Sequence, residues 1–301
     1  MSEVLSIDPV RNALDSFGVM MTETLDALLP EPAGPEGKLF DVMRYSVLAK
    51  GKFLRPYLVR TSALMFDVPE KRYLQVAAAV EMVHTYSLIH DDLPAMDNDD
   101  IRRGSPSCHK AFGEAMAILA GDALLTFSFE VLSTGSTHPE PQVRSDLVAA
   151  LAARAGGTGM VGGQVIDLAS EHSDVDAEQI ARLETMKTGA LIAFATAAGG
   201  MLGQAGTDVV QTLETFGFEL GLAFQITDDV LDVEGDEYDL GKKVGKDAES
   251  GKATLVSALG VDGARREARR VTDRALARLD QFGARADEMR SVAEFVLARK
   301  N

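Results

Sequence analysis

The chain has 301 residues, 46% of them hydrophobic, which is enough for one large core or two domains and excludes a disordered protein. Its formal net charge of −16 argues against a nucleic-acid-binding protein, whose binding surface would be basic. Because Cys108 is the single cysteine, no intrachain disulfide can form, and a reducing, cytoplasmic environment is expected.

The sequence predicts neither a secretory signal nor a membrane span. Residues 1–12 lack the basic and apolar regions of a signal peptide. The most apolar run, residues 191–202, is interrupted by two glycines and is shorter than the about 20 apolar residues that a bilayer requires. We therefore expect a cytoplasmic protein without a nucleic-acid or membrane partner.

Long Ala/Leu/Met-rich segments with apolar residues at helical spacing predict an all-α fold, and strand-like alternation is hard to find. We expect one domain over residues 1–301, because no low-complexity linker or fixed repeat interrupts the pattern. The predicted helices lie near residues 8–29, 37–50, 54–66, 70–92, 113–134, 142–155, 160–171, 176–199, 207–233, 252–259, 262–282 and 287–299. The predicted loops are 30–36, 93–112, 135–141 and 234–251.

The first chemical signal in chain order lies between the helices predicted at 37–50 and 54–66. Lys52 and Arg55 are three residues apart next to a helix N-terminus, which is a natural place to bind an anion. Taken alone, the pair is more simply interpreted as helix-end charges.

An acidic run follows the helix predicted at 70–92. Crowded carboxylates repel one another unless a cation lies between them, and Mg²⁺ shares such oxygen ligands with substrate phosphates. Two arginines follow at once, and guanidinium groups bind phosphate oxygens. The pattern therefore indicates a site for metal and phosphate, with a solvated acidic loop as the alternative. The residues are Asp91, Asp92, Asp97, Asp99, Asp100, Arg102 and Arg103.

His84 lies seven residues before Asp91 and shares its helix face at about 10 Å along the axis. An ordinary core or surface histidine and a site residue are equally consistent with this position. Pro94 ends the helix. Asp97 is six residues beyond Asp91, so the loop must bend back if both carboxylates bind the same ions.

A second acidic cluster occurs in the helix predicted at 207–233. Asp228 and Asp232 are four residues apart, and like charges at that spacing destabilise a helix unless they are neutralised. Two clusters on two long helices are a stronger signal than one, because carboxylates on facing helices of a bundle can hold metals.

Three further features suit a charged ligand but have ordinary alternatives. Lys187 lies in an apolar helical segment and needs an anion. Gly163, inside a predicted helix, indicates close packing or room for a ligand. The basic loop around Lys242 suits either a lid or a solvated loop.

Together, these motifs resemble the trans-isoprenyl diphosphate synthases, and most closely the bacterial farnesyl diphosphate synthases, from about residue 36 to the C-terminus. Their two aspartate-rich motifs correspond to Asp91-Asp92-(x4)-Asp97 and Asp228-Asp229-(x2)-Asp232. The further matching positions are Lys52, Arg55, His84, Arg102, Arg103, Gln164, Lys187, Thr188, Phe224, Gln225, Gly241 and Lys242.

The resemblance implies a helical bundle around a central cavity, a homodimer, and about three Mg²⁺ ions in each active site. It implies a prenyltransferase reaction: Mg²⁺-assisted ionisation of dimethylallyl or geranyl diphosphate, attack by the double bond of isopentenyl diphosphate, and proton loss to give (2E,6E)-farnesyl diphosphate. No side chain stands out as a general base, and in this family the released diphosphate is thought to serve.

The resemblance also implies residue roles. The metal ligands would be Asp91, Asp92, Asp97, Asp228 and, less directly, Asp232. The allylic diphosphate would contact Arg102, Lys187 and Lys242, and isopentenyl diphosphate would bind Lys52, Arg55, His84 and Arg103. Oxygen dipoles near Lys187, Thr188 and Gln225 would stabilise the carbocation.

Product length in the family depends on the helix before the first motif. Tyr86 is five residues before Asp91, about 7.5 Å deeper along the axis, and resembles the floor of a farnesyl diphosphate synthase. A helical wheel instead brings Ser87 closer to the face of Asp91, so both are chain-length candidates. A geranylgeranyl diphosphate synthase is the alternative product assignment.

The chain departs from the family pattern at Lys50 and Phe53, where two glycines and a further basic residue are common, and at Thr254-Leu255-Val256. One diphosphate contact and one helix start are therefore expected to differ. The alternatives are a terpene cyclase, disfavoured by the second diphosphate-binding set; a metal phosphohydrolase, disfavoured by five scattered histidines; and a non-catalytic subunit, disfavoured by two intact acidic motifs.

Overall fold

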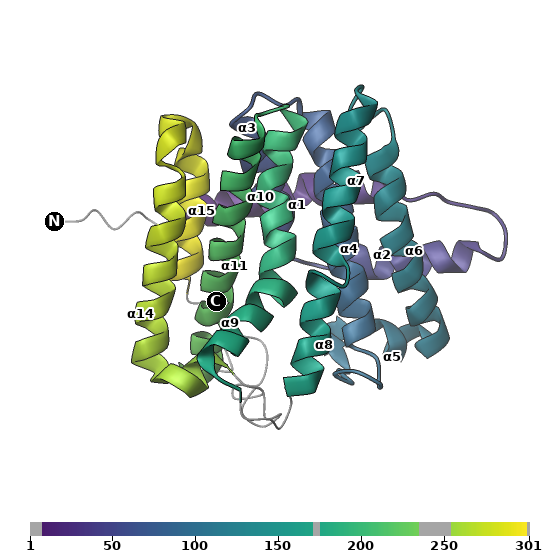
Figure 1. Cartoon of the computed structure of the whole chain (residues 1–301). Helices are drawn as coiled ribbons and strands as arrows, with labels where there is room; N and C mark the ends of the chain where they lie inside the picture. Colours follow the sequence, from purple (N-terminus) through teal and green to yellow (C-terminus); the bar gives the residue numbers. More distant parts are fainter. Residues whose placement is uncertain (1–7, 171–174, 235–253, 300–301) are drawn as a thin grey trace. The chain divides into compact units, whose positions relative to one another are not determined.

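The structure is a computed structural model of the chain, and it describes residues 8–170, 175–234 and 254–299 (Figure 1). Its described part is almost entirely helical, which confirms the predicted all-α class. In chain order the elements are α1 (Asp8–Leu28), α2 (Gly37–Val47), α3 (Leu54–Leu64), α4 (Glu70–Asp91), strands β1 (Ile101–Arg102) and β2 (Ser105–Pro106), α5 (Cys108–Phe112), α6 (Glu114–Ser133), α7 (Pro141–Ala155), α8 (Met160–Ser170), α9 (Ala177–Glu184), the π-helix η1 (Thr185–Gly189), α10 (Ala190–Leu202), α11 (Thr207–Glu234), α14 (Leu255–Arg278), the 3₁₀-helix η2 (Asp280–Ala286) and α15 (Asp287–Ala298).

The chain forms two compact units. Unit 1 comprises Met1–Val10, Thr61–Asp67 and Ala149–Asn301, and unit 2 comprises Arg11–Arg60 and Val68–Val148. The first aspartate cluster belongs to unit 2 and the second to unit 1. A single domain over residues 1–301 stays a prediction.

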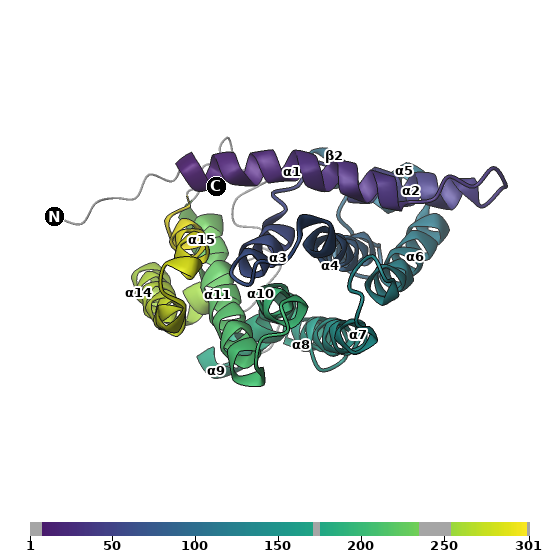
Figure 2. The same cartoon turned by 90° about the horizontal axis from the view of Figure 1, so that it is seen from above.

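The central helix of unit 2 is α4, which packs against α2 and α6 (Figure 2). Residues 76–83 are all buried, so this helix has no solvent face over two turns. Apart from Glu81 these eight residues are apolar, and a helix that is buried on every side has only a weak amphipathic pattern. The first aspartate cluster begins where this rigid helix ends, at Asp91.

In unit 1 the corresponding buried helix is α10, whose residues 190–200 are all buried. It packs along α11, and α11 also packs along α14 (Figure 1). Gly221 of α11 lies so close to Gly189 that an added Cβ would stand 2.5 Å from the Gly189 Cα. The glycine therefore permits close helix packing directly before the second aspartate cluster.

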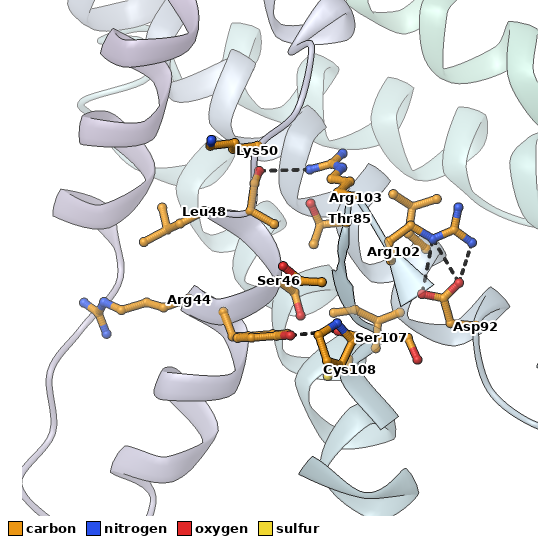
Figure 3. A pocket seen from close by; sticks show the side chains of 17 residues that line it. Arg44, Ser46, Leu48, Lys50, Thr85, Asp92, Arg102, Arg103, Ser107 and Cys108 are labelled. Carbon is orange, nitrogen blue, oxygen red and sulfur yellow. Dashed lines mark hydrogen bonds and ion pairs between the residues drawn. The ribbon is translucent and has the colours of Figure 1, made fainter. Parts of the chain in front are cut away.

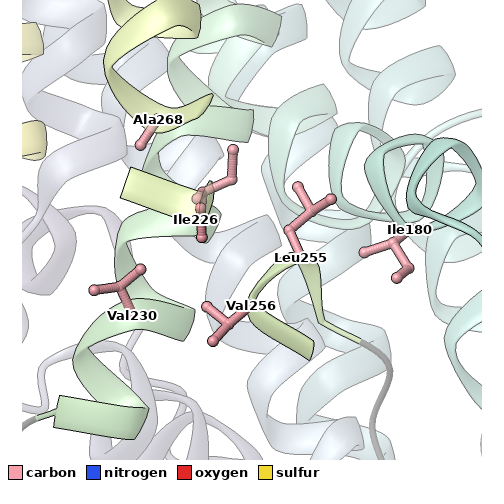
Figure 4. Packing of buried hydrophobic residues seen from close by; sticks show 7 residues of the cluster. Ile180, Ile226, Val230, Leu255, Val256 and Ala268 are labelled. Carbon is pink, nitrogen blue, oxygen red and sulfur yellow. The ribbon is translucent and has the colours of Figure 1, made fainter. Parts of the chain in front are cut away.

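An apolar cluster holds the end of α11 that carries that aspartate cluster. Ile226 and Val230 of α11 pack with Leu255 and Val256 of α14 and with Ile180 of α9 (Figure 4). Burying side chains of this size stabilises the fold by about 1.5–3 kcal/mol each. The carboxylates at 228 and 232 are thus mounted on a well-packed helix.

Local signals account for several helix ends. Asp176 caps α9, because its carboxylate accepts from the Gln179 N–H at 2.9 Å while the Gln179 side chain accepts from the Asp176 N–H at 3.0 Å. The helices predicted at 252–259 and 262–282 form one element, α14, with a kink at Gly260, whose φ of 71° is left-handed. Residues 252 and 253 lie outside the described residues.

Two departures from the predicted elements occur near the candidate site. The helix predicted at 176–199 is interrupted by the π-helix η1, and the loop predicted at 93–112 contains the β1–β2 hairpin and the short helix α5. Hydrophobic periodicity detects neither feature, because each helix or strand involved has five residues or fewer.

One helix of the described residues, α6, is long and apolar enough by length and composition to cross a membrane. The core helices of soluble proteins pass the same test. Within unit 2, Ala117, Ala120 and Leu124 of this helix are buried, whereas Ile118 and Leu119 are exposed.

Candidate active site

The first aspartate cluster is formed by the end of α4 and the loop after it. This loop bends back, because the Asp97 N–H donates to the Asp91 carbonyl at 2.8 Å and the Asn98 N–H donates to the Leu93 carbonyl at 3.1 Å. Asn98 has a left-handed φ of 50°, a conformation that asparagine tolerates well. The bend that Asp91 and Asp97 would need in order to bind the same ions is therefore present in the backbone.

Arg102 of β1 contacts both oxygens of the Asp92 carboxylate. Its Nε lies 3.0 Å from Oδ1 and 3.3 Å from Oδ2, and its Nη2 also contacts Oδ1 (Figure 3). Asp92 is only 2% exposed. Burial raises the pKa of Asp92, opposed by the hydrogen bond from Arg102. Burial disfavours the charge of Arg102, but Asp92 outweighs it and raises the pKa of Arg102.

Arg103 occupies the tip of the β1–β2 hairpin. Arg102 pairs with Ser105, so Arg103 and Gly104 form a two-residue turn, with φ of 54° and 79°. Two left-handed residues are the signature of a type I′ turn, which matches the twist of the flanking strands. The non-glycine residue is held in this strained conformation by its side chain, which donates to the Ala49 carbonyl at 3.3 Å and to Glu81 Oε1 at 3.4 Å.

The predicted anion-binding residues of unit 2 include a close pair. Arg55 Nη1 lies 3.3 Å from His84 Nε2. Burial, and then the positive charge of Arg55, lowers the pKa of His84 well below its ordinary value, so the ring is neutral and its Nε2 accepts this hydrogen bond. Lys52 precedes Phe53, whose left-handed φ of 45° and buried ring shape this loop.

Sequence reasoning missed Glu81, the buried carboxylate among these cations. Burial raises the pKa of Glu81, while the charges of Arg103 and Arg55 lower it. Glu81 lies three residues before His84 and therefore on the same helix face, which was a usable signal. The pattern was masked by the apolar residues around it.

The two chain-length candidates differ in their surroundings. Tyr86 is 6% exposed and packs edge-on against His90, with ring centroids 5.8 Å apart. Burial, and then the charge of Asp91, raises the pKa of Tyr86 to about 12. Ser87 is half-buried and donates to its own helix at the His84 carbonyl, at 2.9 Å. The assignment of the floor to either residue stays a prediction.

A cavity of about 590 Å³ lies between the β1–β2 hairpin, α4 and the end of α2 (Figure 3). Both hairpin arginines and Asp92 line it, together with apolar side chains of α4 such as Leu88 and Ile89. The Tyr45 hydroxyl donates to the Pro106 carbonyl at 2.7 Å and so attaches the hairpin to α2. The cavity therefore combines guanidinium groups with an apolar wall.

The second aspartate cluster lies on α11 in unit 1. Asp229 and Asp232 are each 3% exposed, whereas the side chain of Asp228 is 42% exposed. The Thr188 hydroxyl donates to Gln225 Oε1 at 3.1 Å, and Gln225 Nε2 donates to Asp229 Oδ1 at 3.0 Å. This chain of hydrogen bonds connects η1 to the cluster. Single π-helical turns of this kind are frequent at functional sites.

Lys187 has the anionic partner that its apolar surroundings require. Its Nζ lies 2.5 Å from Asp167 Oδ2 of α8. Gly163 of α8 allows this approach, because a Cβ added there would stand 2.3 Å from the Lys187 backbone nitrogen. Close packing is thus confirmed as a sufficient reason for this glycine.

Arg299, which follows α15, is a second residue that sequence reasoning missed. Its Nη2 donates to Asp228 Oδ1 at 2.7 Å and to the Phe224 carbonyl at 2.9 Å. Its guanidinium carbon lies 3.7 Å from the centroid of the Phe224 ring. No local pattern connects positions 71 residues apart, so only the structure could reveal this pair.

The side chains of the two clusters suit a hard cation. Within the described residues no three His, Cys, Asp or Glu side chains surround a single point closely enough to hold an ion by themselves. Mg²⁺ is usually bound through one or two carboxylates together with phosphates and water, so an all-carboxylate donor set fits it. Lys242 lies outside the described residues.

The helical fold and the two aspartate clusters define the class of helical isoprenoid synthases. A polyprenyl synthetase family model matches residues 36–294, and the chain belongs to that family. The farnesyl diphosphate synthase of Bacillus subtilis (strain 168) is 43% identical over 258 residues, covering 84% of this chain and 87% of that protein. A geranylgeranyl diphosphate synthase of Cyanophora paradoxa is 39% identical over 283 residues, covering 94% of each.

A solved structure agrees with this assignment. The apo structure of an FPP/GFPP synthase from Zymomonas mobilis has a TM-score of 0.87 and 41% sequence identity, covering 97% of this chain and all of that one. The resemblance inferred from the motifs is therefore confirmed at the level of family and fold.

Proposed function

We propose that the chain is a Mg²⁺-dependent farnesyl diphosphate synthase, which condenses isopentenyl diphosphate with dimethylallyl or geranyl diphosphate to (2E,6E)-farnesyl diphosphate. One observation carries the proposal: unit 2 contains both a carboxylate cluster and a separate cationic group around Arg55, His84 and Arg103. The first suits a metal-bound diphosphate and the second a diphosphate without metal, which supports a reaction between two diphosphate substrates. Farnesyl diphosphate synthases among the relatives support the same reaction.

The proposed metal ligands are Asp91, Asp92 and Asp97 in unit 2 and Asp228 and, less directly, Asp232 in unit 1. Bound Mg²⁺, about three ions, would neutralise the charge that develops on the leaving diphosphate. Arg102 and Lys187 would contact the same diphosphate, and Lys242 is proposed for this role from the sequence alone. Both described cations already bind carboxylates, Asp92 and Asp167, so each exchanges a protein partner for the substrate.

Lys52, Arg55, His84 and Arg103 would hold the diphosphate of isopentenyl diphosphate. Guanidinium groups bind phosphate oxygens in a fixed geometry, which keeps the double bond in place for attack. Glu81 orients Arg103, because Arg103 Nη2 lies 3.4 Å from Glu81 Oε1. Because His84 is neutral, it adds a hydrogen-bonding group without further charge.

The bond that breaks is the allylic C–O bond, and the bond that forms joins the allylic carbon to the terminal carbon of isopentenyl diphosphate. The oxygens of Thr188 and Gln225 and the backbone at Lys187 would stabilise the intervening carbocation. The proton lost from the new chain passes to the released diphosphate, which supplies the base.

We further propose Tyr86 or Ser87 as the residue that limits chain length, and a homodimer located in the cytoplasm. The homodimer is expected from the resemblance to the family. Light scattering on the purified protein tests the dimer.

A geranylgeranyl product is the alternative, supported by the Cyanophora relative.

The deciding experiment supplies radiolabelled isopentenyl diphosphate with dimethylallyl, geranyl or farnesyl diphosphate, with and without Mg²⁺, and separates the products by length. We expect a metal-dependent farnesyl product. A geranylgeranyl product would retain the reaction and remove the length assignment. Release of diphosphate from the allylic substrate without condensation would instead indicate a terpene cyclase or a hydrolase.

A further inference from the structure

Arg299 follows the last helix and lies beyond residues 36–294, which the family model matches. It is 8% exposed although it carries a full charge. Its backbone N–H donates to the Phe295 carbonyl at 2.9 Å, and the neighbouring Leu297 packs against the apolar cluster of α11 and α14. The backbone that carries this guanidinium is therefore firmly attached to unit 1.

The guanidinium makes three contacts with one turn of α11. It stacks on the Phe224 ring at 3.7 Å, donates to the Phe224 carbonyl at 2.9 Å and donates to Asp228 Oδ1 at 2.7 Å. A buried charge is unfavourable without such partners. Burial lowers the pKa of Arg299, opposed by the charge of Asp228. Stacking and hydrogen bonding together fix the plane of the guanidinium relative to the helix.

The geometry indicates that Arg299 orients the Asp228 carboxylate and does not compete with a metal ion for it. Arg299 contacts one oxygen of the carboxylate, and the Asp228 side chain is 42% exposed. A partner that holds one oxygen and leaves the other accessible orients a metal ligand, as outer hydrogen-bond partners commonly do. The contact thus selects one rotamer of Asp228.

We propose that Arg299 is a positioning residue, which holds the Asp228 carboxylate in the orientation that binds Mg²⁺ together with diphosphate. The proposal rests on the proposed function of Asp228 as a metal ligand. It extends the active site beyond residues 36–294, which the family model matches.

The test compares Arg299→Gln and Arg299→Lys with a matched control, Arg154→Gln. Arg154 also pairs with a carboxylate of α11, at 2.8 Å from Glu214 Oε1, and lies over the Phe218 ring at 5.2 Å. Glu214 precedes Asp228 by 14 residues, about 21 Å along the helix. The control therefore removes the same kind of contact from the same helix at a distance from the aspartates.

Two quantities are measured on each full-length protein. Calorimetric titration with Mg²⁺ at a fixed concentration of inorganic diphosphate gives the Mg²⁺ concentration at half-saturation. The thermal midpoint without ligands reports on stability alone. The condensation assay on the wild-type protein is run alongside, so that a failure of the proposed function is recognised separately.

We expect Arg299→Gln to raise the half-saturating Mg²⁺ concentration about tenfold, the lower end of the effect of losing an outer metal partner. Arg299→Lys should recover part of the loss, because the charge remains while the planar fork is gone. Arg154→Gln should bind Mg²⁺ like the wild type. In an Asp228→Asn background, Arg299→Gln should have no further effect on Mg²⁺ binding.

Unchanged or tighter Mg²⁺ binding by Arg299→Gln, in a wild-type protein that condenses isopentenyl diphosphate, would overturn the proposal. If Arg299→Gln does not fold, Arg299→Lys decides: weaker Mg²⁺ binding than Arg154→Gln supports the proposal, and equal binding overturns it. A wild-type protein without Mg²⁺-dependent condensation would remove the proposed function and this inference with it.

Discussion

Each aspartate cluster contains an arginine–aspartate pair, and the two pairs are built differently. In unit 2, Arg102 contacts both oxygens of Asp92, whose side chain is 2% exposed. In unit 1, Arg299 contacts one oxygen of Asp228, whose side chain is 42% exposed. Both pairs are ion pairs, but Arg102 occupies both oxygens of a buried carboxylate, whereas Arg299 contacts one oxygen of a carboxylate that remains partly exposed.

The difference has a consequence for ligand binding. As a proposed Mg²⁺ ligand, Asp92 would give an oxygen to the metal after its bond with Arg102 rearranges, and an incoming diphosphate would offer Arg102 a new partner. Asp228, as a proposed ligand, could bind Mg²⁺ through its second oxygen while Oδ1 keeps its hydrogen bond from Arg299. We therefore expect Mg²⁺ and diphosphate to bind to the first cluster together, and we expect the second cluster to bind Mg²⁺ without such a rearrangement.

Asp92→Asn should have the largest effect, lowering kcat by about 10²–10³-fold, because charge stabilisation of the leaving diphosphate is lost. Asp99→Asn is the matched control, since Asp99 contacts the same Arg102 at 3.4 Å and is not among the proposed metal ligands. Both are measured by product formation at saturating substrates. Equal losses for the two variants would show that Arg102, and not the metal, is what Asp92 serves.

Arg102→Gln should change Mg²⁺ binding in the opposite direction to Arg299→Gln. Without diphosphate, freeing Asp92 from its hydrogen-bonded partner should tighten Mg²⁺ binding about tenfold, the size of one hydrogen bond to a charged group. The KM for the allylic diphosphate should rise in the same variant. Calorimetry without diphosphate checks the first effect, and weaker binding there would contradict the comparison.

The neutral His84 beside the arginines of unit 2 should make the protein less stable in acid. Because the pKa of His84 is lowered well below 6.5 in the folded state, the unfolded chain binds a proton first as pH falls. Stability should therefore decline below pH 6.5, down to the folded pKa, by up to about 1.4 kcal/mol per pH unit. His84 keeps some exposure, so a smaller slope is expected. Urea unfolding at several pH values, compared with His84→Asn, isolates this contribution; parallel curves for the two proteins would exclude it.

Tyr86→Ala should alter product length with the smallest effect on rate, because neither arginine–aspartate pair is touched. If the Tyr86 ring limits the space for the growing chain, its removal shifts the product from farnesyl to geranylgeranyl diphosphate. Ser87→Ala is the neighbouring control, and its product should stay unchanged. A longer product from Ser87→Ala alone would move the floor to that position.

Sequence reasoning reached the features whose cause is local. The helices followed from apolar spacing, and a bend between Asp91 and Asp97 was expected on the condition that both carboxylates bind the same ions. It failed at η1 and at the β1–β2 hairpin, where packing and a strained Arg103 decide the backbone. Glu81 was within reach, because it shares the face of His84 at a spacing of three residues.

The sequence by itself determined the helical class, the two carboxylate clusters and the need of Lys187 for an anion, because each depends on neighbours within one or two helical turns. Only the tertiary structure decided which partners meet. Lys187 with Asp167, Thr188 with Gln225 and Arg299 with Asp228 are separated by 20, 37 and 71 residues. Such contacts depend on how the buried helices pack. Hydrophobic periodicity along the sequence extends over only a few residues and cannot predict them.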